Sequence, residues 1–189
     1  MKRPLKRNFY NRDTLKVAQD LLGCVIARKI GKKEIRAMIT ETEAYIGEDD
    51  LASHASKGRT KRSELMFGEA GRAYVYMVYG MYHCFNIVTE KKDFPAAVLI
   101  RAVKIDDVEY KKTNGPGKLC KLLRIDRKLN GYDITKREKI WIESGDAKFL
   151  KSKKIKTDKR IGIDYAKHCK EYLWRFSLIE NKFSKNTKK

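Results

Sequence analysis

The chain has 189 residues, and 44 lysines and arginines outnumber 24 aspartates and glutamates to give a formal net charge of +20. This length provides for one sizeable hydrophobic core, so we expect a single domain over residues 1–189, and the charge favours a polyanionic partner without excluding a basic ribosomal protein. No apolar run approaches the length of a membrane span and residues 1–4 form no signal segment, which predicts a cytoplasmic protein, nucleoid-associated if the source is bacterial.

The first third of the chain predicts a helix followed by two strands. Residues 13–14 can cap a helix that ends at Gly23, because short polar side chains favour helix starts and glycine favours helix ends. Residues 24–29 and 35–45 have the composition of strands. A polar loop then leads to a basic run at residues 57–62.

The middle of the chain predicts further strands and a second helix. Residues 73–79 and 82–89 are rich in aromatic and β-branched residues and flank Gly80, which predicts a hairpin. Residues 96–105 form a nearly continuous apolar run, typical of a buried strand. Asn114 is expected to cap the helix that follows.

The last third predicts short strands at residues 140–142 and 174–179. The lysine-rich stretch 148–160 is interpreted as solvated surface, and residues 182–189 as a flexible basic tail. Because strands mostly follow strands, the expected fold class is α+β. We expect a curved, largely antiparallel β-sheet with surrounding helices and a protruding β-hairpin.

The cysteines and histidines carry no signature of a metal site. The four cysteines lie far apart and form no C-x-x-C pair, and the three histidines lack the spacing of metal ligands. We therefore expect reduced, buried thiols and neither a metal nor another cofactor.

Two carboxylates continue the apolar face of the strand at residues 35–45. Alternate side chains of a strand share a face, so Glu41, Glu43 and Tyr45 lie on the same side as the apolar residues before them. A partly buried glutamate beside a second carboxylate has a raised pKa, which suits a general base. The alternative, slightly favoured by this segment alone, is that the strand ends here and both carboxylates are solvated.

The predicted hairpin is crowded with tyrosines, at residues 74, 76, 79 and 82. Most of these rings are expected to pack the sheet, but Tyr79 and Met81 lie at the turn and cannot be core. An exposed aromatic side chain at a tip can wedge into a nucleic-acid duplex. Asn86 falls on a predicted buried face, where its amide requires a hydrogen-bond partner.

Two further residues depart from their local patterns. Arg101 interrupts the apolar strand at residues 96–105, which predicts pairing with a carboxylate, as a structural ion pair, or with a phosphate. His54 lies in an acidic loop, and a lone loop histidine is more typical of a surface than of a site.

Taken together, these segments resemble the alkyladenine (3-methyladenine) DNA glycosylase family, the mammalian type that also has bacterial members. The resemblance covers nearly the whole chain, and it depends on the order of the matching tracts rather than on any one of them. The tracts are Asn8–Thr14 with Leu21–Gly23, Thr40–Tyr45, His54, Gly58–Thr60 with Met66–Phe67, Tyr74–Tyr82, Asn86–Ile87, Leu99–Ala102, Asn114–Leu119, Arg160–Ile163 and Trp174–Phe176.

The resemblance implies a chemistry for two of these residues. Glu43 matches the family's general base, which activates the water that attacks C1′ of the deoxyribose, whereas Glu41 has no catalytic role in the family. Arg101 matches an arginine near that water and the backbone of the flipped nucleotide. No lysine in the matching strand could form a Schiff base. A monofunctional enzyme is therefore expected, which hydrolyses the glycosidic bond and leaves an abasic site.

The resemblance also implies how a damaged base is held. Tyr45, His54 and Tyr76 match residues that sandwich the flipped base, and Asn86 matches one that narrows the pocket against the exocyclic amine of guanine. The expected substrate is double-stranded DNA containing 3-methyladenine, with 7-methylguanine, hypoxanthine and ethenoadenine as further candidates.

Contacts with the rest of the duplex are assigned to other side chains. Tyr79 matches the residue that intercalates where the base has left, with Met81 beside it. We assign Arg59, Lys61 and Arg62 to contacts with the DNA backbone, and we expect a monomer. Two alternatives are a non-catalytic lesion-binding protein on the same fold, which would not need Glu43, and an RNA-binding protein, which would not explain the ordered tracts.

Overall fold

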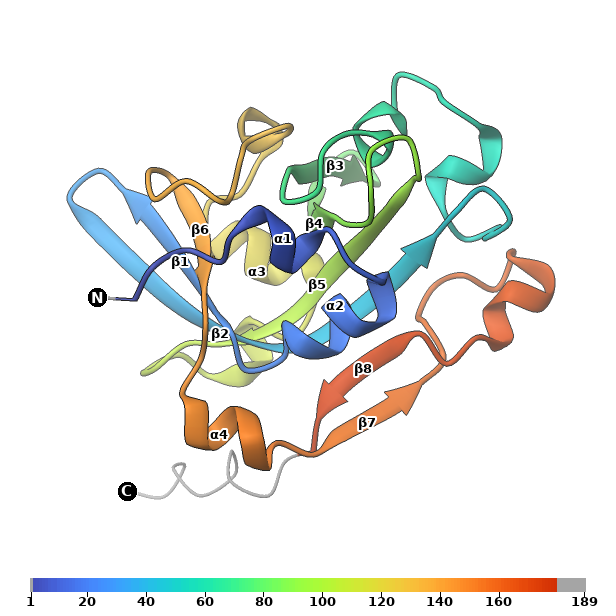
Figure 1. The fold of residues 1–189 in the computed structure, drawn as a ribbon. Helices are drawn as coiled ribbons and strands as arrows, with labels where there is room; N and C mark the ends of the chain where they lie inside the picture. The colour runs from blue at the N-terminus through green and yellow to red at the C-terminus, as the bar shows by residue number, and fades with distance from the viewer. Residues whose placement is uncertain (1, 180–189) are drawn as a thin grey trace.

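The computed structural model describes residues 2–179, which contain an open, antiparallel sheet of eight strands and four α-helices (Figure 1). The strand order is β3-β4-β5-β2-β1-β6, with β8 paired to β2 and β7 paired to β8. The strands are β1 (Val25–Ile30), β2 (Lys33–Ile46), β3 (Ala73–Val78), β4 (Tyr82–Val88), β5 (Ala96–Lys104), β6 (Ile140–Glu143), β7 (Ile155–Asp158) and β8 (Arg175–Leu178). The α+β class predicted from the sequence is confirmed, and the predicted tail at 182–189 lies outside the described residues.

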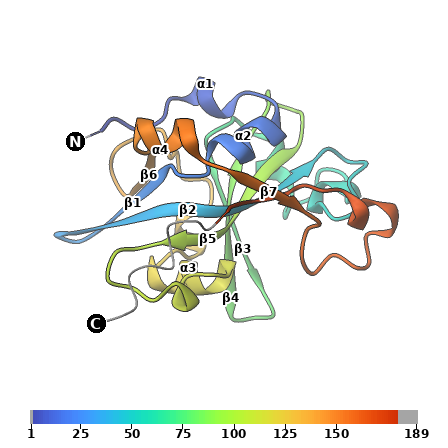
Figure 2. The same cartoon turned by 90° about the horizontal axis from the view of Figure 1, so that it is seen from below.

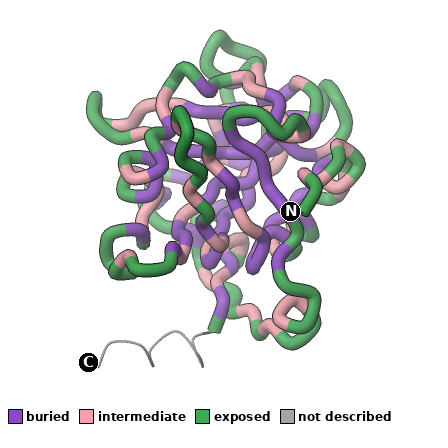
Figure 3. The backbone as a smooth tube through the Cα atoms, turned by 90° about the vertical axis from the view of Figure 1, so that its left-hand side faces the viewer, coloured by how far each residue is buried: buried purple, intermediate pink, exposed green. Residues whose placement is uncertain are grey.

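Helices cover both faces of the sheet. Figure 2 shows α1 (Arg7–Tyr10), α2 (Thr14–Asp20) and α4 (Ala147–Ser152) on one face and α3 (Pro116–Leu122) on the other. The apolar side chains of α2 and α3 join those of the strands in one core, so that buried backbone runs through the middle of the molecule and exposed loops surround it (Figure 3). Within this part of the chain no helix combines the length and apolar character needed to cross a membrane.

The long strand β2 organises the sheet around its second half. Residues 33–38 pair with β1 and residues 41–43 pair with β8 along the same edge, while β5 pairs along the other edge. The pairing with β5 is irregular around Glu41, and such bulges re-aim side chains. Thr42 donates a hydrogen bond to the carbonyl oxygen of Ala18 in α2. Because side chains alternate along a strand, Glu41 and Glu43 point away from α2, toward the opposite face of the sheet, which α3 covers.

Most predicted elements lie within two residues of their observed bounds, but the start of α3 is different. The cap is Gly115, with φ of +153°, and the Asn114 side chain makes no cap but accepts a hydrogen bond from Lys118 Nζ. Asn114 is still bridged to Ala102 in β5. The helix begins only after Gly115, whose backbone tolerates this φ. The predicted cap was therefore one residue too early.

The interpretation of residues 148–160 as solvated surface is wrong in part. Most of the lysines are exposed, but the stretch forms all but the first residue of α4 and all of β7. Lys153 donates hydrogen bonds to the carbonyl oxygens of Gln19 and Leu22. Arg160, at the end of the stretch, is buried. Charge density alone did not reveal these long-range partners.

Candidate active site

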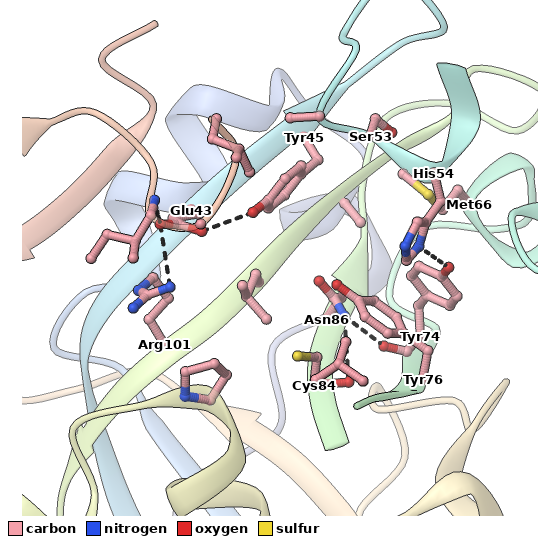
Figure 4. Close-up of a pocket in the computed structure, with 18 of the residues that line it drawn as sticks. Glu43, Tyr45, Ser53, His54, Met66, Tyr74, Tyr76, Cys84, Asn86 and Arg101 are labelled. Atoms are coloured by element: carbon pink, nitrogen blue, oxygen red, sulfur yellow. Dashed lines mark hydrogen bonds and ion pairs between the residues drawn. The ribbon is translucent and has the colours of Figure 1, made fainter. Parts of the chain in front are cut away.

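A pocket of about 430 Å³ opens where strands β2 to β5 meet the loop that follows β7 (Figure 4). The described lining brings together residues that are distant in the sequence, as the family resemblance predicted. The predicted site residues in the lining are Glu43, Tyr45, His54, Arg62, Tyr76, Tyr79, Asn86 and Arg101. Met81, Arg59 and Lys61 do not line it.

Glu43 is fully buried at one end of this pocket. Its Oε2 accepts a 2.8 Å hydrogen bond from the Tyr45 hydroxyl, and its Oε1 accepts a 2.9 Å bond from the backbone N–H of Ile161. Arg101 Nη1 lies 3.4 Å from Oε1 (Figure 4). The alternative in which both carboxylates of β2 are solvated is therefore wrong.

Burial raises the pKa of Glu43 above that of an ordinary glutamate, and Glu41 adds to the rise. Arg101, the Ile161 amide and the Tyr45 hydroxyl act in the opposite direction, because each favours the ionised carboxylate. The net effect moves the pKa of this carboxylate toward neutral pH, and a general base is most effective when its pKa lies near the working pH.

Arg101 pairs with both carboxylates of β2, which confirms the predicted ion pair. Its Nε lies 3.3 Å from Glu41 Oε1, and the same oxygen accepts a 2.9 Å hydrogen bond from Arg175 Nη1 in β8. Glu41 therefore shares its charge between two arginines. Arg101 contacts both carboxylates, and its nitrogen–oxygen distances to Glu41 and Glu43 are 3.3 and 3.4 Å, so neither ion pair is short.

The opposite wall of the pocket is aromatic. His54 Nδ1 lies 2.7 Å from the Tyr74 hydroxyl, and the His54 ring is 4.5 Å from that of Tyr76. Ser53 holds the start of the short helical turn that carries His54 by accepting a hydrogen bond from the backbone N–H of Ala55. The surface position suggested by the local sequence is therefore wrong for His54.

His54 is expected to be neutral throughout the physiological pH range. Burial, together with the nearby charges of Arg62 and Lys57, lowers its pKa from 6.5 to about 4. Titration of the C2 proton by NMR should show no midpoint for His54 between pH 5.5 and 8, and the signal is assigned by its loss in His54→Gln. A midpoint near 6.5 would contradict this environment. Because the unfolded state takes up this proton first, His54 also lowers stability as the pH falls from about 6.5 toward 4.

Asn86 is buried at the side of the pocket, as predicted, and its amide is firmly held. Its Nδ2 donates to the carbonyl oxygen of Tyr74 at 3.0 Å and to that of Cys84 at 3.4 Å. The Asn86 amide is thus a fixed polar wall rather than a side chain that can swing aside.

The tip of the β3–β4 hairpin carries two exposed side chains, of which Tyr79 lines the pocket and Met81 does not. Tyr79 is 89% exposed and Met81 is 67% exposed. Tyr79 has φ of +51° and Gly80 has φ of +67°. This conformation is uncommon for a tyrosine and costs free energy. The hairpin holds the Tyr79 ring out into solvent.

The basic run predicted to contact DNA divides into two parts. Arg62 lines the pocket and its guanidinium lies 5.2 Å from the centre of the Tyr76 ring. Arg59 is exposed and paired with Asp93 at 2.5 Å, and Lys61 is exposed on the surface. Only Arg62 is placed to contact a molecule inside the pocket, so contacts between DNA and the other two remain predictions.

The loop after β7 supplies site residues that were not singled out from the sequence. Ile161 bonds Glu43 through its backbone, Tyr165 lines the rim and is 69% exposed, and Arg160 pairs with Asp50 behind the pocket. The available signals were the Arg160–Ile163 tract of the family resemblance and the acidic loop that contains Asp50. Neither indicates the partners in space.

No three His, Cys, Asp or Glu side chains of residues 2–179 gather closely enough to bind a metal. The four cysteines are free and buried.

Comparisons with known proteins identify the family. The family model of methylpurine-DNA glycosylase (MPG) matches residues 8–182. A Clostridium perfringens (strain 13 / Type A) protein named "Putative 3-methyladenine DNA glycosylase" is 44% identical over 95% of this chain and 97% of its own length. Proteins of the same name from Methanocella arvoryzae and Legionella pneumophila (strain Lens) are 46% identical (91% of this chain, 90% of theirs) and 45% identical (98% and 100%). The chain belongs to the methylpurine-DNA glycosylase family, as its sequence predicted.

Proposed function

We propose that this chain is a monofunctional 3-methyladenine DNA glycosylase that flips the damaged purine out of duplex DNA, hydrolyses its N-glycosidic bond and leaves an abasic site. The observation that carries the proposal is the buried carboxylate of Glu43, held beside Arg101 at the end of an aromatic pocket. Relatives that match nearly the whole chain and are named "Putative 3-methyladenine DNA glycosylase" support the same substrate.

The placement of Glu43 supports base flipping. An enzyme that acts on a base must extrude it, because the reacting atoms are inaccessible inside a duplex. Glu43 is fully buried, whereas Tyr79 is 89% exposed at the rim of the same pocket. A nucleotide rotated into the pocket brings its C1′ toward Glu43 and leaves a gap in the stack that the Tyr79 ring can fill.

The pocket walls suit a cationic purine. The rings of Tyr45 and Tyr76 offer π faces, which attract a positively charged aromatic base. The low pKa of His54 keeps its ring neutral at physiological pH, so it does not repel such a base. The rigid Asn86 amide narrows the pocket and disfavours the extra exocyclic amine of guanine.

The chemistry requires little beyond a base and a fixed water. A purine methylated at N3 carries positive charge, so the electrons of the C1′–N9 bond leave with it and it departs neutral without an acid. The water oxygen bonds to C1′ and its proton passes to Glu43, whose charge also stabilises the electron-poor sugar. No lysine lies among the described lining residues, which supports hydrolysis rather than strand cleavage through a Schiff base.

Other lesions follow from the same chemistry. 7-Methylguanine is also cationic and requires no acid, although its exocyclic amine must pass Asn86. Hypoxanthine and ethenoadenine are neutral and depend more on the pocket, where the low pKa of His54 leaves no imidazolium to act as an acid at neutral pH. We therefore propose 3-methyladenine as the preferred substrate. We also propose a monomer as the active form, because one chain supplies all the pocket residues described above.

The proposal is tested by incubating the purified protein with methylated duplex DNA in the presence of a chelator. We expect free 3-methyladenine on chromatography, and strand breaks only after alkali treatment of the abasic sites. Binding of the damaged duplex without release of any base, including hypoxanthine or ethenoadenine, would favour a lesion-binding protein instead.

A further inference from the structure

A buried ion pair lies directly behind the pocket, between Arg160 and Asp50. Their side chains are 0% and 1% exposed, and Arg160 Nη1 and Nη2 donate to the two Asp50 oxygens at 2.6 and 2.8 Å. The pair is therefore bidentate, with each Nη group donating to one oxygen of the same carboxylate, which is the strongest geometry for such a pair. Neither residue has a role in the chemistry proposed above.

Arg160 also ties other segments to this pair. Its Nη1 donates to the carbonyl oxygen of Ala44, between Glu43 and Tyr45 in β2, and its Nη2 donates to that of Cys169. The guanidinium lies 4.8 Å from the centre of the Tyr45 ring and 5.1 Å from that of Trp174. One side chain thus joins the end of β2 to the acidic loop and to the loop after β7.

The residue after Arg160 supplies the backbone N–H that bonds Glu43. The Ile161 side chain is 52% exposed, so core packing of that residue does not hold its amide in place. Gly162 follows with φ of +74°, and the chain becomes buried again only at Ile163. On its N-terminal side the Ile161 amide is held by the contacts of Arg160 and, one residue earlier, by the hydrogen bond that the Lys159 carbonyl oxygen accepts from Arg175 Nε at 2.7 Å.

Stability alone is a weak reason for such a pair. Removing two charges from water costs several kcal/mol each, and apolar residues of similar size often serve as well. The pair is placed where it fixes both a donor to Glu43 and the face of Tyr45. We propose that Arg160, held by Asp50, is a positioning residue of the glycosylase site, an inference that rests on the proposed function: it holds the Ile161 N–H on Glu43 and the Tyr45 ring against the base.

The rate–pH profile reports this role. Loss of the Ile161 hydrogen bond removes one group that favours ionised Glu43, so the pH at half-maximal rate should rise, by about one pH unit for a lost N–H donor. The charged and titratable groups that face Glu43 from the packed elements are Glu41 and Tyr45 of β2, Cys84 of β4, Arg101 of β5 and Arg160 itself. Of these, only Arg160 is changed in the test.

The first variant replaces the pair by apolar residues, Asp50→Leu with Arg160→Met. We expect the protein to fold with a lower midpoint of thermal unfolding. No lone charge is left buried, but the backbone N–H groups of Ile46 and Ala52 lose Asp50, and the carbonyl oxygens of Ala44 and Cys169 lose Arg160. Single-turnover release of 3-methyladenine should fall at least tenfold at neutral pH, since small displacements in a site cost up to about 10²-fold. The rate–pH midpoint should move upward.

Arg160→Lys serves as a second variant if the double variant does not fold. It keeps the positive charge but lacks the planar fork, so it should show the same changes to a smaller degree. The matched control is Arg36→Lys, because Arg36 pairs with the buried Glu143 away from the pocket. Its rate and profile should equal those of the wild type.

The outcomes separate this inference from the proposed function. A wild type that releases no base fails as a glycosylase, whatever the variants do. An active wild type whose folded Arg160 variants keep the same rate and the same pH midpoint overturns the positioning role and leaves the function standing. A fall in thermal stability with an unchanged pH midpoint also overturns it, because that result describes a purely structural pair.

Discussion

Replacing Glu43 with glutamine is expected to slow the release of 3-methyladenine by about 10²–10⁴-fold, the usual contribution of a general base. Glutamine has the shape of glutamate but cannot take a proton from water. The local hydrogen bonds can survive the change. The glutamine oxygen can still accept from the Ile161 N–H, and the Tyr45 hydroxyl, which donates to Glu43, can instead accept from the new amide.

Affinity and rate should therefore separate in Glu43→Gln. Dissociation constants for a lesion-containing duplex should stay close to those of the wild type, while the single-turnover rate falls. The matched control is Glu143→Gln, another fully buried glutamate that bonds Arg36 and Trp141 on the far side of the sheet. Release by Glu43→Gln at the rate of this control would exclude Glu43 as the base and return the lesion-binding alternative.

Local rules predicted the elements that frame the site. The Asp13 cap, which accepts from the Lys16 N–H, follows from the preference of short polar side chains at helix starts. Alternation along β2 placed Glu41, Glu43 and Tyr45 on one face, and their shared contacts bear this out. These predictions succeed because each depends on residues close in the sequence.

The rest of the site depends on partners that are distant in the sequence. Asp50 and Arg160 are 110 residues apart, and nothing local distinguishes the buried Arg160 from the exposed lysines before it. His54 looked like a surface residue until β3 brought Tyr74 to its ring. Arg160 and His54 were indicated only by the ordered match to a family, and that match does not identify the residues that contact them.

Replacing Arg101 with methionine is expected to have the largest effect on folding. The apolar side chain fills much of the same volume, but the buried Glu43 then loses the arginine that pairs with it directly, whereas Glu41 keeps Arg175. Breaking a buried pair from one side costs about 3–5 kcal/mol. The free energy of unfolding at neutral pH should fall by that order, as measured by urea denaturation. Arg101→Lys, which keeps the charge, should lose less.

The loss in Arg101→Met should shrink as the pH is lowered. Arg101 opposes the rise in the pKa of Glu43 that burial causes, so its removal raises that pKa further. A folded-state pKa above the unfolded value means that the folded form binds the proton more tightly, and stability is regained as the pH falls through it. Unfolding curves at pH 7.5 and pH 5 check the sign. An equal deficit at both values would mean that Arg101 stabilises the fold by packing alone.

The same variant separates two roles of Arg101 in the reaction. If Arg101 acts only through the charge of Glu43, the midpoint of the rate–pH curve of Arg101→Met moves to higher pH. The rate then approaches that of the wild type at high pH. If Arg101 also binds the nucleotide or the attacking water, the plateau itself stays low. A low plateau with an unshifted midpoint would contradict the electrostatic coupling to Glu43. It would mean that the 3.4 Å contact between the two side chains has no effect on the pKa of Glu43.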